Sequence, residues 1–128
     1  MESPTMVIDT GIFIEHLRKP DKSRTILASL PNDISIFVSA VTVYELMMGA
    51  TDNQKKTDVE MLLNGLPILP FNEEVSLKAA EIYHNLRRRN SLIEFRDIFI
   101  AATALTFQLP IKTLNQGHFQ RIENLELA

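Results

Sequence analysis

The sequence has 128 residues, of which 45% are hydrophobic and 23% are charged, and its formal net charge is −3. These values are typical of one globular domain with its own hydrophobic core, and they show no overall basic character that would indicate nucleic-acid binding. No apolar run approaches the roughly 18 residues of a membrane span. The first residues resemble no signal peptide and cysteine is absent, so we expect a cytoplasmic protein without disulfides or thiolate metal sites.

The chain starts with an apolar run, Met6-Val7-Ile8, which is too short for a helix and is typical of a buried strand. Residues 1–5 are expected to form a flexible tail, which leaves a single domain over residues 6–128. Two helices are predicted next, over residues 12–17 and 21–30, each ended by a proline.

A second predicted strand, over residues 34–38, leads directly into the most apolar helix of the chain. Ser39 is a suitable N-cap for this helix, which is predicted over residues 40–48. Because the helix is apolar nearly all round, we expect it to be buried. Its polar exceptions, Thr42 and Glu45, are three positions apart and therefore share a face.

The second half of the chain continues the alternation of helices and short strands. A helix that opens near Asp52 precedes a third strand at residues 68–69, and Asn72 caps the clearest amphipathic helix. A helix over residues 97–108 is apolar on most sides, and residues 110–113 form a fourth strand, with a fifth candidate near the C-terminus. Strands that alternate with helices predict a parallel α/β sheet.

Three carboxylates, Asp9, Glu45 and Asp97, stand in otherwise hydrophobic stretches. Isolated buried carboxylates are rare, because desolvating a negative charge is costly unless a cation or hydrogen bonds compensate for it. Parallel α/β sheets bind their ligands outside the carboxyl ends of the strands. Asp9 ends the first strand, Glu45 follows the second and Asp97 opens the late helix, so we expect the three to converge on one site.

Carboxylates that share a cleft repel one another, so a cation, or a proton on one of them, has to balance their charge. Oxygen ligands of this kind suit Mg²⁺ or Mn²⁺, and such an ion can activate a water for in-line displacement at phosphorus. The histidines show no zinc spacing, and the four glycines form no phosphate-binding motif. A structural interpretation stays open for each acid: helix capping for Asp9 and Asp97, and a salt bridge for Glu45.

Four segments carry a more specific signal when they are taken together and in order. They are Val7-Ile8-Asp9-Thr10, Ser39 to Leu46, Asp97 to Ala104, and Thr113-Leu114-Asn115 with His118-Phe119. With them the chain resembles the PIN-domain ribonucleases, and within that class the VapC-type toxins of toxin–antitoxin pairs. The resemblance covers residues 6–127, which is essentially the whole chain.

The resemblance implies a three-layer α/β/α sandwich around a central parallel sheet of four to five strands. It also implies a Mg²⁺- or Mn²⁺-dependent endoribonuclease that hydrolyses RNA phosphodiesters. Asp9, Glu45 and Asp97 fall on the core acidic positions that bind the metal ion. Asn115 falls where many members carry a fourth acid, and it is expected to assist catalysis. A homodimer is further implied, with an antitoxin whose C-terminal segment covers the groove.

Neighbouring polar residues are candidates for supporting roles. Hydroxyl groups are expected to hydrogen-bond the carboxylates or a water beside them, and these are Thr10, Ser39, Thr42 and Thr113. Arg96 is the candidate contact for an RNA phosphate, and an ion pair is its structural alternative. The run Arg87–Arg89 has the same two interpretations, RNA contact or a solvated helix end. His118 is expected to pack or hydrogen-bond, and Glu94 is a further candidate for the acidic site rather than an expected member of it.

Two other functions are alternatives to the ribonuclease. A catalytically inactive PIN-like module that binds RNA or a protein stays open, although the intact acids argue against it. A phospho-signalling receiver domain has similar length and alternation, but it carries an acidic pair after its first strand and an aspartate after its third. This chain has only Asp9 and then Pro70-Phe71-Asn72 at those places, which excludes the receiver domain.

Overall fold

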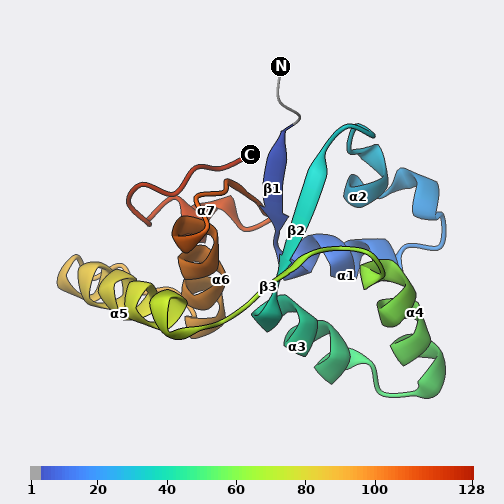
Figure 1. The fold of residues 1–128 in the computed structure, drawn as a ribbon, viewed down its shortest axis with the longest axis horizontal. Coiled ribbons are helices and arrows are strands. Elements are labelled where there is room, and N and C mark those ends of the chain that lie inside the picture. The colour runs from blue at the N-terminus through green and yellow to red at the C-terminus, as the bar shows by residue number, and fades with distance from the viewer. Residues whose placement is uncertain (1–3) are drawn as a thin grey trace.

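The computed structural model describes residues 4–128 of the chain, which form a small parallel sheet flanked by helices (Figure 1). The strands are β1 (Thr5–Ile8), β2 (Ser35–Ser39), β3 (Ile68–Leu69) and β4 (Ile111–Lys112). The helices are α1 (Thr10–Arg18), α2 (Ile26–Ser29), α3 (Ala40–Gly49), α4 (Asn53–Leu63), α5 (Glu73–Arg88), α6 (Phe95–Thr106) and α7 (Gln116–Phe119), with a 3₁₀ turn, η1 (Lys22–Arg24).

The sheet has the strand order β3-β2-β1-β4, and every pairing is parallel. Val7 is the central residue, since it pairs with Phe37 of β2 on one side and with Ile111 of β4 on the other. The chain moves outward from β1 to β3 and then returns to place β4 on the opposite side of β1. The carboxyl ends of β1 and β4 therefore form a topological switch point, where sheets of this type bind ligands. The predicted fifth strand is reduced to a single bridge between Ile111 and Leu127.

Side chains of β1 alternate between two cores, one on each face of the sheet. Val7 belongs to a core with α5, α6 and Phe119, whereas Met6 and Ile8 pack with residues of α1, α3 and α4. Figure 1 shows α5 and α6 on one side of the strands and α1, α2 and α4 on the other. Burial of a large apolar side chain contributes about 1.5–3 kcal/mol, so both faces of the sheet need cover. The predicted three-layer α/β/α architecture is confirmed.

The predicted helix over residues 21–30 is wrong as one element, because Thr25 divides it into η1 and α2. Thr25 has an extended backbone (φ −83°, ψ 162°) and its hydroxyl accepts from the Ala28 amide at 3.1 Å as the N-cap of α2. The same hydroxyl lies 2.6 Å from Nδ1 of His16 on α1. The contact with α1 holds the residue in a capping conformation, and the local apolar pattern carries no sign of it.

Burial of α3 was also predicted wrongly for one of its faces. Thr42 and Leu46 are buried, but Tyr44 is 65% exposed and Met48 is 60% exposed. These two residues are four positions apart and lie on the same face of the helix. An exposed apolar face of this kind marks a surface for a partner more often than a solvent-facing surface.

The sheet begins at Thr5, one residue before the predicted strand, and the Ser35 amide donates to the Pro4 carbonyl at 2.9 Å. The rest of the expected tail, residues 1–3, lies outside the described residues. Across residues 4–128, no helix combines the length and the apolar character that crossing a bilayer requires.

Thr25→Val should lower the free energy of unfolding by about 1–2 kcal/mol, because valine keeps the shape but neither caps α2 nor meets His16. Urea denaturation followed by circular dichroism measures the change. Thr57→Val is the matched control, since the Thr57 hydroxyl is exposed and donates only to the Asn53 carbonyl within α4. Equal losses in both variants would show that the link between α1 and α2 adds nothing.

Candidate active site

A cavity of about 220 Å³ opens at the carboxyl ends of β1 and β4, at the switch point of the sheet. Its walls come from the junction of β1 with α1, from α3, from the start of α6 and from the loop between β4 and α7. The lining residues are Asp9, Thr10, Gly11, Ile14, Glu45, Glu94, Arg96, Asp97, Leu114, Asn115 and His118. The structure thus brings together the predicted acids and Asn115.

Asp9 is the most deeply enclosed of the three acids, with 7% of the residue exposed. Its Oδ1 accepts from the Thr10 amide at 2.8 Å, and its Oδ2 accepts from the Thr113 hydroxyl at 2.7 Å. Burial raises the pKa of Asp9 above its ordinary value, and the charges of Asp97 and Glu45 add to the rise, while the two hydrogen bonds oppose it. The Asp9 side chain does cap α1, which is the structural role considered for it from the sequence. Capping does not offset the repulsion between Asp9 and the other two carboxylates.

Glu45 is held at the end of a chain of hydroxyl groups. The Thr10 hydroxyl donates to Glu45 Oε1 at 2.8 Å and lies 2.8 Å from the Thr42 hydroxyl. The Ser39 hydroxyl donates to Thr42 at 3.2 Å. Each hydroxyl has one proton, so Thr42 has to donate to Thr10 and all protons point toward Glu45. Only Thr10 touches the carboxylate directly; Thr42 and Ser39 act through it.

The second oxygen of Glu45 faces Arg96. Nη1 of Arg96 lies 3.4 Å from Glu45 Oε2, and its Nε lies 2.9 Å from Glu94 Oε2. The structural interpretation of Glu45 as one half of a salt bridge is therefore realised. Glu94 lines the cavity, but it is engaged by Arg96.

Asp97 lies in the first turn of α6, which begins at Phe95 and not at Asp97 as predicted, and it does not cap the helix. The N-cap position is Glu94, whose side chain makes no cap hydrogen bond. Asp97 Oδ2 instead lies 2.9 Å from His118 Nδ1 and 3.4 Å from Asn115 Nδ2. His118 and Asn115 are themselves 2.7 Å apart. His118 hydrogen-bonds, as expected, but its partner is a site carboxylate, which sequence reasoning missed. Its position three residues after Asn115, within one helical turn, was the available signal.

The donor set fits a hard divalent cation in its chemistry, since three carboxylates and an amide line one cavity. Within residues 4–128, however, no three carboxylate or imidazole groups are gathered closely enough to hold an ion. Two of the three acids are engaged by other groups, since Arg96 and Thr10 contact Glu45 while His118 and Asn115 contact Asp97. Ligation by all three acids requires that some of these partners give way.

The arginine run at the end of α5 lies apart from this cavity. Arg89 donates to the Asn85 side chain at 2.7 Å and to the Arg121 carbonyl, and no member of the run lines the carboxylate cavity. Cations at a helix C-terminus are favoured by the helix dipole. The solvated-helix interpretation of Arg87–Arg89 accounts for this geometry.

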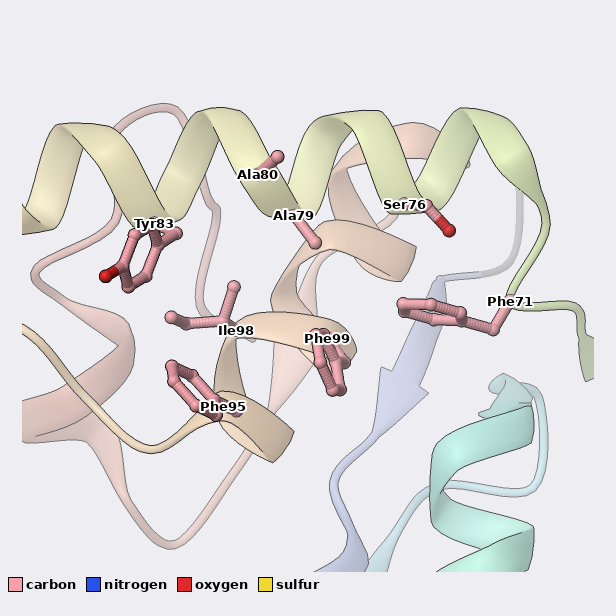
Figure 2. Close-up of a pocket in the computed structure, with 8 residues that line it drawn as sticks. All are labelled: Phe71, Ser76, Ala79, Ala80, Tyr83, Phe95, Ile98 and Phe99. Atoms are coloured by element: carbon pink, nitrogen blue, oxygen red, sulfur yellow. The ribbon is translucent and has the colours of Figure 1, made fainter.

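An apolar hollow of about 400 Å³ lies between α5 and α6. Figure 2 shows Tyr83 and Ala79 of α5 pointing toward Phe95, Ile98 and Phe99 of α6. A neighbouring hollow of about 500 Å³ continues it toward α3. We call the two together the apolar face, defined by Tyr44, Met48, Phe71, Tyr83, Phe95 and Phe99. Glu45 and Arg96 also line the second hollow, so the apolar face reaches the edge of the carboxylate cavity.

Asp9→Asn should stabilise the metal-free protein at neutral pH. Because the folded state raises the pKa of Asp9, the folded protein loses stability relative to the unfolded chain as pH rises from about 4 through that raised value. The Asp9→Asn variant has no carboxyl group to titrate at this position, so it does not lose this stability. Melting temperatures from pH 4 to pH 8 in the presence of a chelator measure it, with Asp33→Asn at an exposed position as control. Parallel curves for wild type and Asp9→Asn would contradict the assigned cause.

Comparison with known proteins agrees with this geometry. The PIN domain family model matches residues 6–125. Ribonuclease VapC10 of Mycobacterium tuberculosis (strain H37Rv) is 31% identical over 121 residues, which is 94% of this chain and 90% of the relative. Among solved structures, VapBC2 from Rickettsia felis, bound to a promoter DNA fragment, matches with a TM-score of 0.85 at 25% identity over 97% of each chain. VapBC-1 from nontypeable Haemophilus influenzae matches with a TM-score of 0.80 at 28% identity over 97% of this chain and 96% of that chain. The resemblance found in the sequence is thereby confirmed: this chain belongs to the PIN domain family and, within it, to the VapC group.

Proposed function

We propose that the protein is a metal-dependent endoribonuclease that hydrolyses RNA phosphodiesters, and that it serves as the toxin of a toxin–antitoxin pair. The observation that carries the proposal is the convergence of Asp9, Glu45 and Asp97 on one cavity at the switch point of the sheet. Relatives named as VapC ribonucleases, and solved neighbours named as VapBC, support the reaction and the pairing. RNA is found in the cytoplasm, so the cytoplasmic location expected from the sequence is part of this proposal.

Asp9, Glu45 and Asp97 would hold Mg²⁺ or Mn²⁺, which supplies charge neutralisation at the phosphate and lowers the pKa of a water. The protein's own contribution is orientation. Thr113 and Thr10 fix the oxygens of Asp9 and Glu45 through short hydrogen bonds. Asn115 adds a neutral amide beside Asp97, where it can assist without adding negative charge. Arg96, with a 58% exposed side chain at the rim, is the candidate contact for the phosphate.

The antitoxin partner has a suitable place beside the active site. A groove of about 290 Å³ between α1, α3 and α4 has apolar walls, including Leu17 and Val59, and the basic residues Arg18 and Lys55. It shares Ile14 and Glu45 with the carboxylate cavity. A peptide segment that filled the groove would therefore end against Glu45 and close the cavity, which is the inhibition that the resemblance implies.

A homodimer is part of the proposal, and the apolar face is the surface we assign to it. Tyr44 is 65% exposed and lines the same hollow as Phe71 and Phe99, whose rings are 4.9 Å apart. Phe95 is 64% exposed, and its ring lies 6.1 Å from that of Tyr83. Aromatic side chains are enriched at protein interfaces, where their burial gives most of the binding energy.

Asp97→Asn should abolish Mg²⁺-dependent RNA cleavage while leaving the protein folded, because it removes one ligand charge and keeps the shape. We expect a loss of at least about 100-fold, since even indirect partners of metal ligands contribute 10–100-fold. The rise in melting temperature with Mn²⁺ should shrink in parallel. Cleavage of a defined RNA and thermal melts measure the two effects, with Asp33→Asn as control.

Full cleavage by pure Asp97→Asn would remove Asp97 from the reaction. A wild-type protein that binds RNA but cuts none at any Mg²⁺ concentration would instead favour the inactive PIN-like binding module. The two results are distinct, so one set of measurements decides between the enzyme and its alternative.

Tyr44→Glu should shift the protein from dimer to monomer at micromolar concentration, because it places a charge in the second hollow of the apolar face. Analytical ultracentrifugation measures the change. Leu77→Glu is the matched control, since Leu77 is equally exposed at 65% but lines neither hollow of the apolar face. A dimer that survives Tyr44→Glu and dissociates with Leu77→Glu would place the interface elsewhere.

A further inference from the structure

Arg96 is the only lysine or arginine that lines the carboxylate cavity in the described part of the chain. Its guanidinium spans two carboxylates, with Nε 2.9 Å from Glu94 Oε2 and Nη1 3.4 Å from Glu45 Oε2. The contact with Glu94 keeps the guanidinium at the rim of the cavity, and the contact with Glu45 directs it toward the carboxylates. The rigid fork of an arginine allows this double contact, which a single ammonium group would not make equally well.

The place of Arg96 in α6 is electrostatically unfavourable for the helix. Arg96 lies in the first turn of α6, where the positive end of the helix dipole disfavours cations and favours anions. Helix stability therefore gives no reason for an arginine here. The acidic surroundings do, because Arg96 is the cation that faces Glu45.

A divalent cation and the guanidinium compete for one carboxylate oxygen of Glu45. Thr10 orients Oε1, and among the described residues Oε2 meets Arg96, so an ion that ligates Glu45 through Oε2 has to displace the guanidinium. Among residues 4–128, the acids are not gathered closely enough to hold an ion, and Arg96 is one of the groups that engage them. A dication and a guanidinium at one oxygen would also repel each other.

We propose that Arg96 is an internal counter-ion that holds Glu45 until the divalent cation binds, and that it then exchanges Glu45 for a phosphate of the RNA. The inference rests on the proposed function, because it uses the same metal site and substrate. Glu94 keeps its hold on Nε during the exchange, so the released Nη groups stay at the rim of the cavity. A guanidinium pairs with phosphate as readily as with carboxylate.

In a single copy of the chain, the exposure of the pair makes the exchange feasible. The Arg96 side chain is 58% exposed, whereas that of Glu45 is 11% exposed. The contact between them lies at the surface of the protein, where ion pairs contribute little, so a divalent cation can displace the arginine. The same pair still reduces repulsion among the three acids before the ion arrives, which a site with free carboxylates could not do.

The first test measures Mn²⁺ affinity by calorimetry, without RNA. Arg96→Gln should bind Mn²⁺ about two- to fivefold more tightly than wild type, which is the range expected from loss of an exposed ion pair. Arg88→Gln is the matched control, because it removes the same charge from a residue that does not line the carboxylate cavity. Unchanged or weaker affinity in Arg96→Gln would overturn the proposal.

A double-mutant cycle separates direct competition from a general charge effect. In a Glu45→Gln background, Arg96→Gln should leave Mn²⁺ affinity unchanged, because the contact that competes with the ion is already gone. A gain of the same size in both backgrounds would overturn the exchange while leaving the metal site intact. Failure of the wild type to bind any Mn²⁺ would overturn the proposed function together with the exchange.

The second half of the exchange is read from cleavage kinetics at saturating Mn²⁺. Arg96→Gln should raise KM for RNA severalfold and change kcat by less than about twofold, because the guanidinium binds the phosphate without entering the reaction. Arg96→Lys should recover part of the loss, since it restores the charge but not the fork. An unchanged KM in Arg96→Gln would show that Arg96 only blocks the site, and would overturn the transfer to phosphate.

Discussion

Three carboxylates that must share one partly desolvated cavity are the constraint on which the rest of this structure depends. Asp9 is 7% exposed, and the charges of Asp97 and Glu45 add to the rise that burial causes in its pKa. Each acid has its own compensation: hydroxyl and amide donors for Asp9, a hydroxyl chain and Arg96 for Glu45, and His118 with Asn115 for Asp97. These partners keep the negative charges in fixed positions.

The topology explains why residues so far apart in sequence meet. Because β4 returns to the free side of β1, the carboxyl ends of both strands lie next to each other, and Thr113 reaches Asp9 across 104 positions of sequence. The hydroxyl chain from Ser39 to Thr10 joins the start of α3 to the start of α1 in the same way. Orientation of the acids therefore depends on the strand order, and a change of register between β1 and β4 would separate Asp9 from Thr113.

The sequence alone predicted those elements in which the local residue pattern matches the environment that the folded protein provides. The parallel sheet and the three acids were found because a carboxylate inside an apolar run is conspicuous, and because strand ends of a parallel sheet share one edge. Thr25 and the exposed face of α3 were predicted wrongly, and His118 was missed as a partner of Asp97, for one common reason. The environment of each depends on tertiary structure. Thr25 contacts His16, Tyr44 of α3 lies on a face that no other element within residues 4–128 covers, and His118 contacts Asp97.

Helix α3 links the catalytic and the assembly properties proposed for this protein. Neighbouring residues of a helix point about 100° apart, so Glu45 faces the carboxylate cavity while Tyr44 and, one turn later, Met48 face outward. The second hollow of the apolar face is lined by Tyr44, Met48, Glu45 and Arg96 together. A second copy that covered this hollow would remove water from around the pair of Arg96 and Glu45. An ion pair gains strength as its surroundings lose water, so dimer formation would make Arg96 harder to displace. If the proposed dimer and metal site both form, occupancy of the apolar face and affinity for the divalent cation would therefore be coupled through α3, without any movement of the sheet.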